Sequence, residues 1–146
     1  MIEIALHEAL RDSVDEVLEK MFFAETLGEA PDAGPVADDI AVEVPFEGEV
    51  PGLMCLHVTA AAAREIAADF LGIEAAEISW TQVSEVVREL ANMICGSVLS
   101  RVESAVVFRL DIPRIVSPTE QLPAASSHTP YCVQLSNGRI AVCIVT

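Results

Sequence analysis

The chain has 146 residues, of which 52% are hydrophobic, and its 23 acidic and 8 basic side chains give a net charge of −15. This balance excludes binding to nucleic acid through a basic patch, because phosphates require positive charge. No apolar run is long enough to span a membrane without a charge, so no membrane partner is expected either. The length predicts one domain over residues 1–146.

The sequence contains no signal-peptide pattern, and its histidines and cysteines have no metal-binding spacing. The N-terminus lacks the basic and apolar regions of a signal peptide, so a cytoplasmic location is the default expectation. Three histidines lie far apart and match no metal-ligand spacing, so no metal of the chain's own is predicted. The four cysteines form no CxxC pair and lie in apolar surroundings, as reduced, buried thiols do: Cys55, Cys95, Cys132 and Cys143.

The first third of the chain predicts a helix, a loop and a hairpin. Apolar residues at helical spacing predict an amphipathic helix over residues 5–25. Pro, Gly and acidic residues mark 26–39 as a connecting loop. Alternating apolar residues predict a strand from Ile40 to Phe46, and residues 52–58, apolar on both faces, predict a central strand paired with it.

Two helices are predicted in the middle of the chain. The first follows Thr59, which can serve as its N-terminal cap, and Gly72 ends it. The second is long, from about Trp80 to Glu103. Ser79 and Gln82 have the spacing of a capping box at its start. The apolar face of this long helix is formed by Val83, Val86, Val87, Leu90, Ile94 and Val98.

The opposite face of the long helix carries an unusual polar stripe. At about 100° per residue, Glu85, Glu89, Asn92 and Gly96 fall within roughly 60° of one another. Asn and Gly are weak helix formers, each less favourable than Ala by roughly 0.5–1 kcal/mol. A requirement other than helicity is therefore indicated at these positions.

The last third predicts extended structure. Residues 105–116 read as an edge strand interrupted by Pro113, followed by a loop over 117–130. A hairpin then spans 131–145, with a type I′ turn at Asn137-Gly138. Counting outward from this turn predicts three cross-strand pairs: Leu135 with Ile140, Val133 with Val142, and Cys132 with Cys143.

The final strand, Ile140–Val145, has no segment after it to cover its edge. An exposed strand edge favours pairing with a second copy. The apolar content is also high for a small monomer. These observations predict a homodimer.

The candidate functional residues of the chain are Glu89 and Asn92. Residues three apart on a helix point the same way and can together enter a cleft on a partner. A carboxamide both donates and accepts hydrogen bonds, so it can hold a water in line for attack on a phosphoryl group. On spacing alone, however, a Glu and an Asn on a helix most often form an ordinary solvated face.

The chain as a whole resembles the CheX branch of the CheC/CheX/FliY phosphatases of bacterial chemotaxis. The resemblance lies in the N-terminal helix, the hairpin and Ala-rich helix, the segment 85–96 and the strand 110–113, in this order. Glu89 and Asn92 match the family motif. Glu85 stands where the motif has Asp or Ser, and Pro113 comes earlier than the family's proline. The motif occurs once here, as in CheX, and twice in CheC.

This resemblance implies an α/β domain of the α+β type, in which a mainly antiparallel sheet is layered with helices. It implies hydrolysis of the aspartyl phosphate on a CheY-like receiver domain. Asn92 would orient the attacking water, Glu89 would pair with a lysine of the receiver's active site, and Glu85 and Gly96 would contact the partner. The required Mg²⁺ would belong to the receiver. The alternatives are a non-catalytic receiver-binding or flagellar-switch module, and a homodimeric scaffold without a receiver partner.

Overall fold

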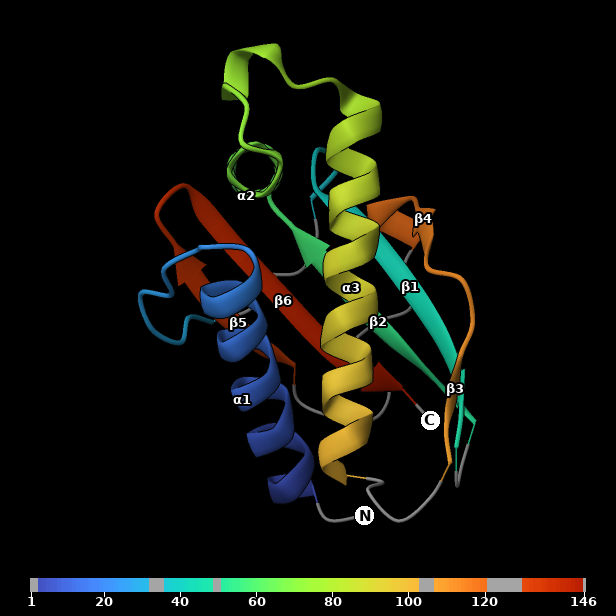
Figure 1. The fold of residues 1–146 in the computed structure, drawn as a ribbon. Coiled ribbons are helices and arrows are strands. Elements are labelled where there is room, and N and C mark those ends of the chain that lie inside the picture. Colours follow the sequence, from blue (N-terminus) through green and yellow to red (C-terminus); the bar gives the residue numbers. More distant parts are fainter. Residues whose placement is uncertain (1–2, 32–35, 49–50, 103–106, 121–129, 146) are drawn as a thin grey trace.

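The computed structural model describes residues 3–31, 36–48, 51–102, 107–120 and 130–145. Within these residues the chain forms three α-helices, two short 3-10 helices and six strands (Figure 1). The elements in chain order are α1 (Glu3–Met21), β1 (Ile40–Glu47), β2 (Gly52–Val58), α2 (Ala60–Leu71), η1 (Ala75–Glu77), α3 (Trp80–Val102), β3 (Arg109–Leu110), β4 (Arg114–Val116), η2 (Pro118–Glu120), β5 (Tyr131–Leu135) and β6 (Gly138–Val145).

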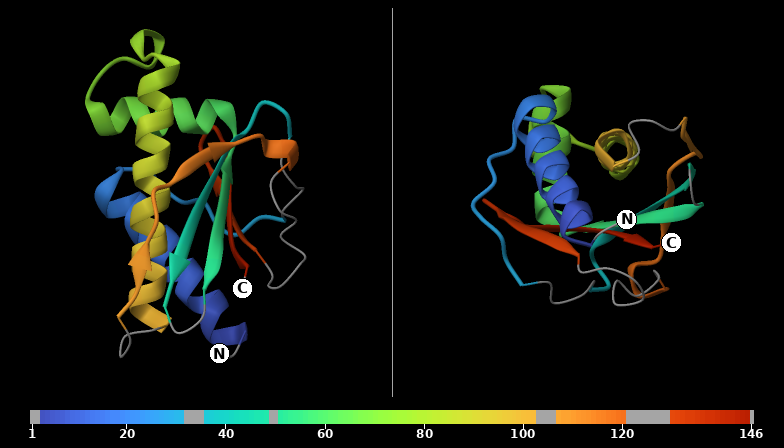
Figure 2. Two further views of the ribbon diagram at one scale, coloured as in Figure 1. Left: turned by 90° about the vertical axis from the view of Figure 1, so that its right-hand side faces the viewer. Right: turned by 90° about the horizontal axis from the view of Figure 1, so that it is seen from below.

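The strands form one antiparallel sheet in the order β3-β1-β2-β6-β5, and β4 also pairs with β1. All three α-helices lie on one face of this sheet, as the view from below in Figure 2 shows. Helix α3 lies between α1 and the edge formed by β3 and β4 (Figure 1). The predicted antiparallel sheet layered with helices is therefore confirmed. No helix in the described part of the chain combines the length and apolarity needed to cross a membrane.

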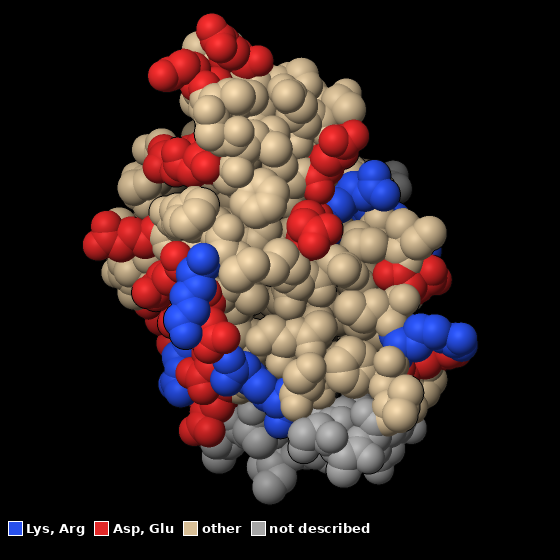
Figure 3. Space-filling view, in the orientation of Figure 1, with Lys and Arg blue, Asp and Glu red and all other residues tan. Residues whose placement is uncertain are grey.

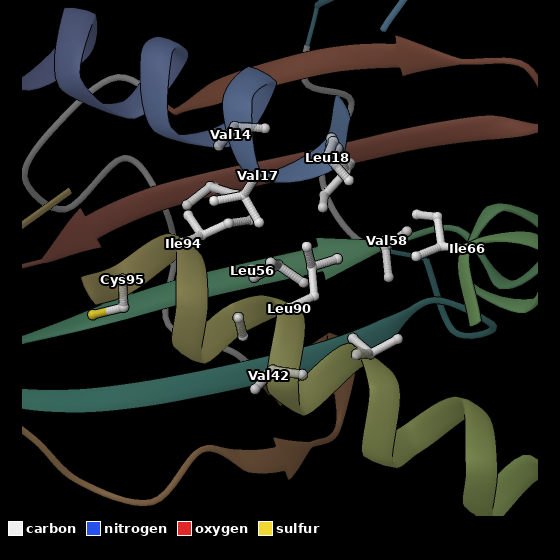
Figure 4. Close-up of a cluster of buried hydrophobic side chains, with 14 of the residues drawn as sticks. Val14, Val17, Leu18, Val42, Leu56, Val58, Ile66, Leu90, Ile94 and Cys95 are labelled. Atoms are coloured by element: carbon white, nitrogen blue, oxygen red, sulfur yellow. The ribbon is translucent and has the colours of Figure 1, made fainter. Parts of the chain in front are cut away.

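Residues of α1, α3 and the sheet meet in a continuous apolar core. Along α3, Leu90 and Ile94 are fully buried, and both point into the cluster drawn in Figure 4. The cluster includes Leu56 from β2 and Val17 from α1, on opposite sides of α3's buried face. Each such side chain contributes about 1.5–3 kcal/mol by leaving water. This packing holds α3 rigidly, with its other face outward.

The first hairpin and the Ala-rich helix form as predicted. Strand β2 spans Gly52–Val58 and pairs with β1 in the middle of the sheet. Helix α2 ends at Gly72, which is left-handed (φ 70°) and donates its N–H to the carbonyl of Ala68. The predicted cap at Thr59 is different, because its hydroxyl makes no cap hydrogen bond and instead accepts the N–H of Arg139 in β6 (3.1 Å).

Helix α1 is shorter at its C-terminus than the predicted range of 5–25. It ends at Met21, because Phe23 adopts a left-handed conformation (φ 58°). The N–H of Ala24 then donates to the carbonyl of Leu18 (2.9 Å), which is a common way to satisfy the last carbonyls of a helix. Glycine usually occupies this position, so a phenylalanine here does not indicate a helix end.

The predicted extended segment 105–116 is confirmed as an edge in its described part. Strands β3 and β4 both pair with β1, and residues 111–113 interrupt the pairing. Residues 105–106 lie outside the described residues, as does most of the predicted loop 117–130. A proline removes one ladder donor, which fits this interruption.

The predicted register of the last hairpin is wrong by two residues. Leu135 pairs with Gly138 rather than with Ile140, and Cys132 pairs with Ala141 rather than with Cys143, so the two-residue turn is Ser136-Asn137. The apolar set keeps its face, because a shift of two positions preserves the alternation. The shift follows from a tertiary contact, since Gly138 packs directly against the side chain of Thr59.

The predicted open edge at the end of the chain is also wrong. Strand β6 lies inside the sheet, paired with β2 on one side and β5 on the other. The outer edge of β5 is itself covered by residues 27–30. Leu27 N donates to Gln134 O (2.8 Å), Gln134 N donates to Gly28 O (2.9 Å), and Ala30 N donates to Cys132 O (2.9 Å). A dimer therefore cannot rest on an uncovered β6.

The four cysteines are buried, and none of them forms a disulfide. Cys55 lies opposite Cys143 in the β2–β6 ladder, and a hydrogen bond to Cys143 together with burial raises the pKa of Cys55. Burial alone raises the pKa of Cys95, in α3, to about 12. Such thiols are poor nucleophiles, so none of them is a candidate for catalysis.

A partly buried hydrogen bond joins α1 to the sheet. The hydroxyl of Tyr131 donates to Oδ1 of Asp15 (2.8 Å). Burial raises the pKa of Asp15, and this hydrogen bond opposes the rise by favouring the carboxylate. The bond therefore stabilises the protein most where Asp15 is ionised.

We expect Tyr131→Phe to lower the free energy of unfolding by about 1–2 kcal/mol at about pH 7, because Asp15 stays partly buried without its donor. The loss should shrink as the pH falls through the folded pKa of Asp15, since the protonated carboxyl needs the donor less. Urea denaturation at about pH 7 and about pH 3 measures both values. An equal loss at both pH values would contradict the role given to the ionised carboxylate.

Candidate active site

Helix α3 begins where the sequence predicts. Ser79 N donates to Oε1 of Gln82 (2.9 Å), and Gln82 N donates to Oγ of Ser79 (3.1 Å), so the predicted capping box is formed. The helix then runs to Val102. Its apolar face is buried as predicted, which fixes the polar stripe on the outer side.

The stripe places Glu85, Glu89 and Asn92 together on the outer face of α3. Both glutamates are exposed, and Asn92 is half-buried. Within the described parts of the chain, none of these three side chains forms a hydrogen bond or an ion pair. Two carboxylates and one carboxamide are therefore held on a rigid helix without a partner, as a site that engages a second molecule requires.

Gly96, the fourth residue of the stripe, faces the chain itself. A Cβ added at Gly96 would lie 3.8 Å from Cδ1 of Leu110 in β3. The missing side chain thus lets Leu110 approach the helix. The polar stripe is bounded at this end by an apolar contact.

One long side of the stripe is bounded by the edge segment 109–116, which Figure 2 shows running along α3. Nε of Arg88 donates to the carbonyl oxygen of Pro113 (3.2 Å). This contact brings Pro113 close to the helix turn that carries Glu85 and Glu89. Sequence reasoning missed Arg88, because an Arg on a helix is ordinarily solvated and its partner here is a backbone carbonyl remote in the chain.

The other long side of the stripe is bounded by α1. Ser97 Oγ donates to Ser13 Oγ (3.0 Å), and Arg101 Nη2 donates to Oε2 of Glu16 (3.0 Å). Ser13 is fully buried, so this bond lies at the closely packed helix contact. These contacts fix the rotation of α3 about its axis and hence the direction in which the stripe points.

The charge on this face is uneven. Figure 3 shows acidic side chains over the upper half of α3, with a basic side chain to their right. The lower half of the helix carries one charged residue, Arg101 in its last turn, which pairs with Glu16 of α1. Arg88 makes no ion pair with Glu85 or Glu89 in the described structure, because its Nε is engaged by Pro113. Glu89 therefore keeps its negative charge available for a cationic group on a partner.

The site holds no cluster suited to a metal ion. Among the described residues, no group of three or more His, Cys, Asp and Glu side chains could hold one. The residues that the site does present can orient water and attract a cation.

Several solved structures share this fold, among them CheX proteins and FliY. Vibrio vulnificus CheX aligns with a TM-score of 0.73 and 21% identity over 95% of each chain. CheX in the Borrelia burgdorferi CheX-CheY-BeF3-Mg complex aligns with a TM-score of 0.71 and 18% identity, covering 94% of this chain and 95% of that one. Thermotoga maritima FliY aligns at 0.60 and 13%, covering 99% and 89%. The chain thus shares its fold with the chemotaxis protein CheX and with FliY.

Within this class the sequence identifies one family. The family model described as chemotaxis phosphatase CheX matches residues 40–136, more than half of the chain. The chain therefore belongs to the CheX family. No curated protein sequence matches it. The matched residues contain all of α3 and the segment that flanks it.

Proposed function

We propose that this protein hydrolyses the aspartyl phosphate on a CheY-like receiver domain, with Asn92 orienting the attacking water and Glu89 pairing with a lysine of the receiver's active site. The observation that carries the proposal is the position of both side chains, without a partner in the described structure, on the outer face of a helix that its core packing holds rigid. Family membership supports the same reaction.

The chemistry suits two side chains on a rigid support. Phosphoryl transfer depends mainly on positioning and on electrostatic stabilisation, so little covalent chemistry is asked of the protein. The amide of Asn92 can accept a hydrogen bond from water and donate one to a phosphoryl oxygen. The carboxylate of Glu89 can fix the lysine that neutralises the developing charge.

The Mg²⁺ is assigned to the receiver. In the Borrelia burgdorferi complex, CheX is bound to CheY together with BeF3 and Mg. We propose the same division here, with no cofactor supplied by this chain. Glu85 would contact the partner beside Glu89. Gly96 would belong to the same contact surface, where its missing side chain lets Leu110 approach the helix.

The test of the proposed function is the rate at which a phosphorylated receiver loses its phosphate with and without this protein. Acceleration supports the phosphatase. Binding to the receiver without acceleration would support the rival, a non-catalytic receiver-binding or flagellar-switch module. Absence of both would leave a scaffold and refute the proposal.

We expect Glu89→Ala to raise the KM for the phosphorylated receiver about tenfold, with a smaller effect on kcat. The variant loses a charge pair that docking partly desolvates, and such pairs govern affinity and encounter. Steady-state kinetics over a range of receiver concentrations measures both constants. Glu77→Ala, an exposed glutamate in η1, is the matched control and should leave both unchanged. An unchanged KM in Glu89→Ala would exclude the proposed pairing.

The homodimer is retained as a proposal on a new basis. Apolar side chains near the C-terminus of α1 are exposed, among them Met21 (46%), Phe23 (69%) and Leu27 (54%). We expect a two-fold dimer through this surface, which leaves α3 free. Sedimentation equilibrium at micromolar concentration should show a dimer that Phe23→Ser weakens. A species that stays monomeric would refute the dimer.

A further inference from the structure

The edge segment runs antiparallel beside α3 at the level of the proposed catalytic residues. Its Leu110 lies against Gly96 and its Pro113 against Arg88. Gly96 and Arg88 are separated by about 12 Å along the helix, and three extended residues from Leu110 to Pro113 cover about 10 Å. Residues 111–112 must therefore lie beside the turns between Arg88 and Gly96, where Glu89 and Asn92 are placed.

This segment is held in place from both sides. Toward the sheet, Asp111 N donates to the carbonyl of Pro45 (2.8 Å), and Arg114 donates to Oε1 of the buried Glu43 (3.2 Å). Toward the helix, Arg88 donates to the carbonyl of Pro113 (3.2 Å). Within the segment, Oδ1 of Asp111 accepts the N–H of Ile112 (2.7 Å). The backbone on both sides of Ile112 is thus fixed.

Ile112 itself points away from the core. Its side chain is 72% exposed, although strong contacts hold its neighbours. A single exposed isoleucine is common on protein surfaces and alone means little. This one differs in lying on a segment whose backbone is held by hydrogen bonds, next to the polar stripe. Its β-branched side chain also has few rotamers to lose on binding. Ile112 is therefore an apolar residue held in a fixed position beside the charged residues of the polar stripe, where a partner could bind it.

We propose that segment 110–114 forms the second half of the receiver-binding surface, with Ile112 packing on an apolar surface of the receiver while α3 meets its active site. Arg88 is a positioning residue, which acts by holding the carbonyl of Pro113 and through it the backbone of Ile112. The proposal rests on the proposed function and deepens it, because it names the contact that gives affinity apart from the residues that act on phosphate.

The first test measures the affinity for a CheY-like receiver loaded with BeF3 and Mg²⁺, together with kcat and KM on the phosphorylated receiver. Ile112→Ala should raise Kd and KM about tenfold and leave kcat within about twofold. Ile112→Val, which keeps the branched contact, should stay within about twofold of wild type. The matched control is Ile73→Ala, an exposed isoleucine in the turn after α2, and it should change nothing.

The second test asks whether Arg88 acts through Ile112. Arg88→Ala should raise Kd about fivefold, and Arg88→Lys, which keeps a donor and the charge, should restore most of the affinity. The double variant Ile112→Ala/Arg88→Ala should raise Kd about tenfold, as Ile112→Ala alone does, rather than about fiftyfold. Multiplicative effects would show that Arg88 acts independently of Ile112 and would overturn its positioning role.

The two proposals fail differently. If Asn92→Ala loses hydrolysis but Ile112→Ala binds like wild type, the apolar contact is refuted and the phosphatase stands. If the protein binds the receiver through Ile112 but never accelerates hydrolysis, the surface stands and the phosphatase is refuted. If the loaded receiver does not bind at all, both are refuted.

Discussion

Asn92→Ala is expected to lower the rate of receiver dephosphorylation at saturating protein by about 100-fold or more, because positioned polar groups at a reacting centre typically contribute this much. The variant should bind the BeF3-loaded receiver within about twofold of wild type. The half-buried amide contributes little contact area, and its proposed partner is a water molecule. Phosphate release followed over time measures the rate of dephosphorylation, and a separate binding titration measures the affinity for the receiver.

Asn92→Gln tests whether position or chemistry matters. It keeps the carboxamide but moves it outward by one methylene, and a displacement of about 1 Å can cost about 100-fold when geometry limits the reaction. We therefore expect Asn92→Gln to be nearly as slow as Asn92→Ala. Full hydrolysis by Asn92→Ala would remove the proposed mechanism, since that mechanism assigns the orientation of the attacking water to the Asn92 carboxamide.

Features set by neighbouring residues could be predicted from the sequence. The capping box of Ser79 and Gln82 involves residues three apart, so its chemistry is complete within one helical turn. The left-handed end of α2 at Gly72 is equally local. The apolar residues on both faces of β2 predicted its central position in the sheet, which the strand order confirms. In each case the deciding interaction lies within the element itself.

Features set by remote residues could not be predicted. The Asn137-Gly138 pair is a strong hairpin signal, yet the turn forms one residue earlier. The reason is that the hydroxyl of Thr59 accepts a hydrogen bond from the backbone N–H of Arg139. Likewise, no local pattern showed that residues 27–30 would cover β5, or that β6 would insert between β2 and β5. Strand order depends on the packing of the whole sheet, which one-dimensional patterns do not encode.

The candidate site divides in the same way. Helical periodicity placed Glu89 and Asn92 on one outward stripe, and the structure brings them together there. Their roles in the reaction stay predictions. The flanking segment was read as an edge strand, but its contact with Arg88 links residues twenty-five positions apart and has no signature in either segment. The sequence therefore predicts the part of this site that lies on the helix, but it does not predict how the sheet edge is placed beside that helix.

Gly138→Ala is expected to have the largest effect on stability, lowering the free energy of unfolding by about 3 kcal/mol. A Cβ at this position would overlap the hydroxyl of Thr59 and lie 3.0 Å from the Cβ of Thr59 and 3.3 Å from that of Ala62. Thr59 cannot retreat freely, because its N–H donates to Arg139 O and its hydroxyl accepts Arg139 N (3.1 Å each). Relief of the clash must break the junction between α2 and β6.

Gly72→Ala is the matched control for this steric effect. Gly72 is also a glycine in an unusual conformation (φ 70°), but a Cβ there would meet no atom within 4 Å. We expect it to lose only about 1 kcal/mol, the conformational cost of a left-handed alanine. The double variant Gly138→Ala/Thr59→Ala removes the hydroxyl that causes the clash and also its hydrogen bond with Arg139. Its loss in the free energy of unfolding should therefore be smaller than the sum of the losses in the two single variants. Equal losses in Gly72→Ala and Gly138→Ala, measured by urea denaturation with unchanged m values, would show that close packing against Thr59 does not determine the turn.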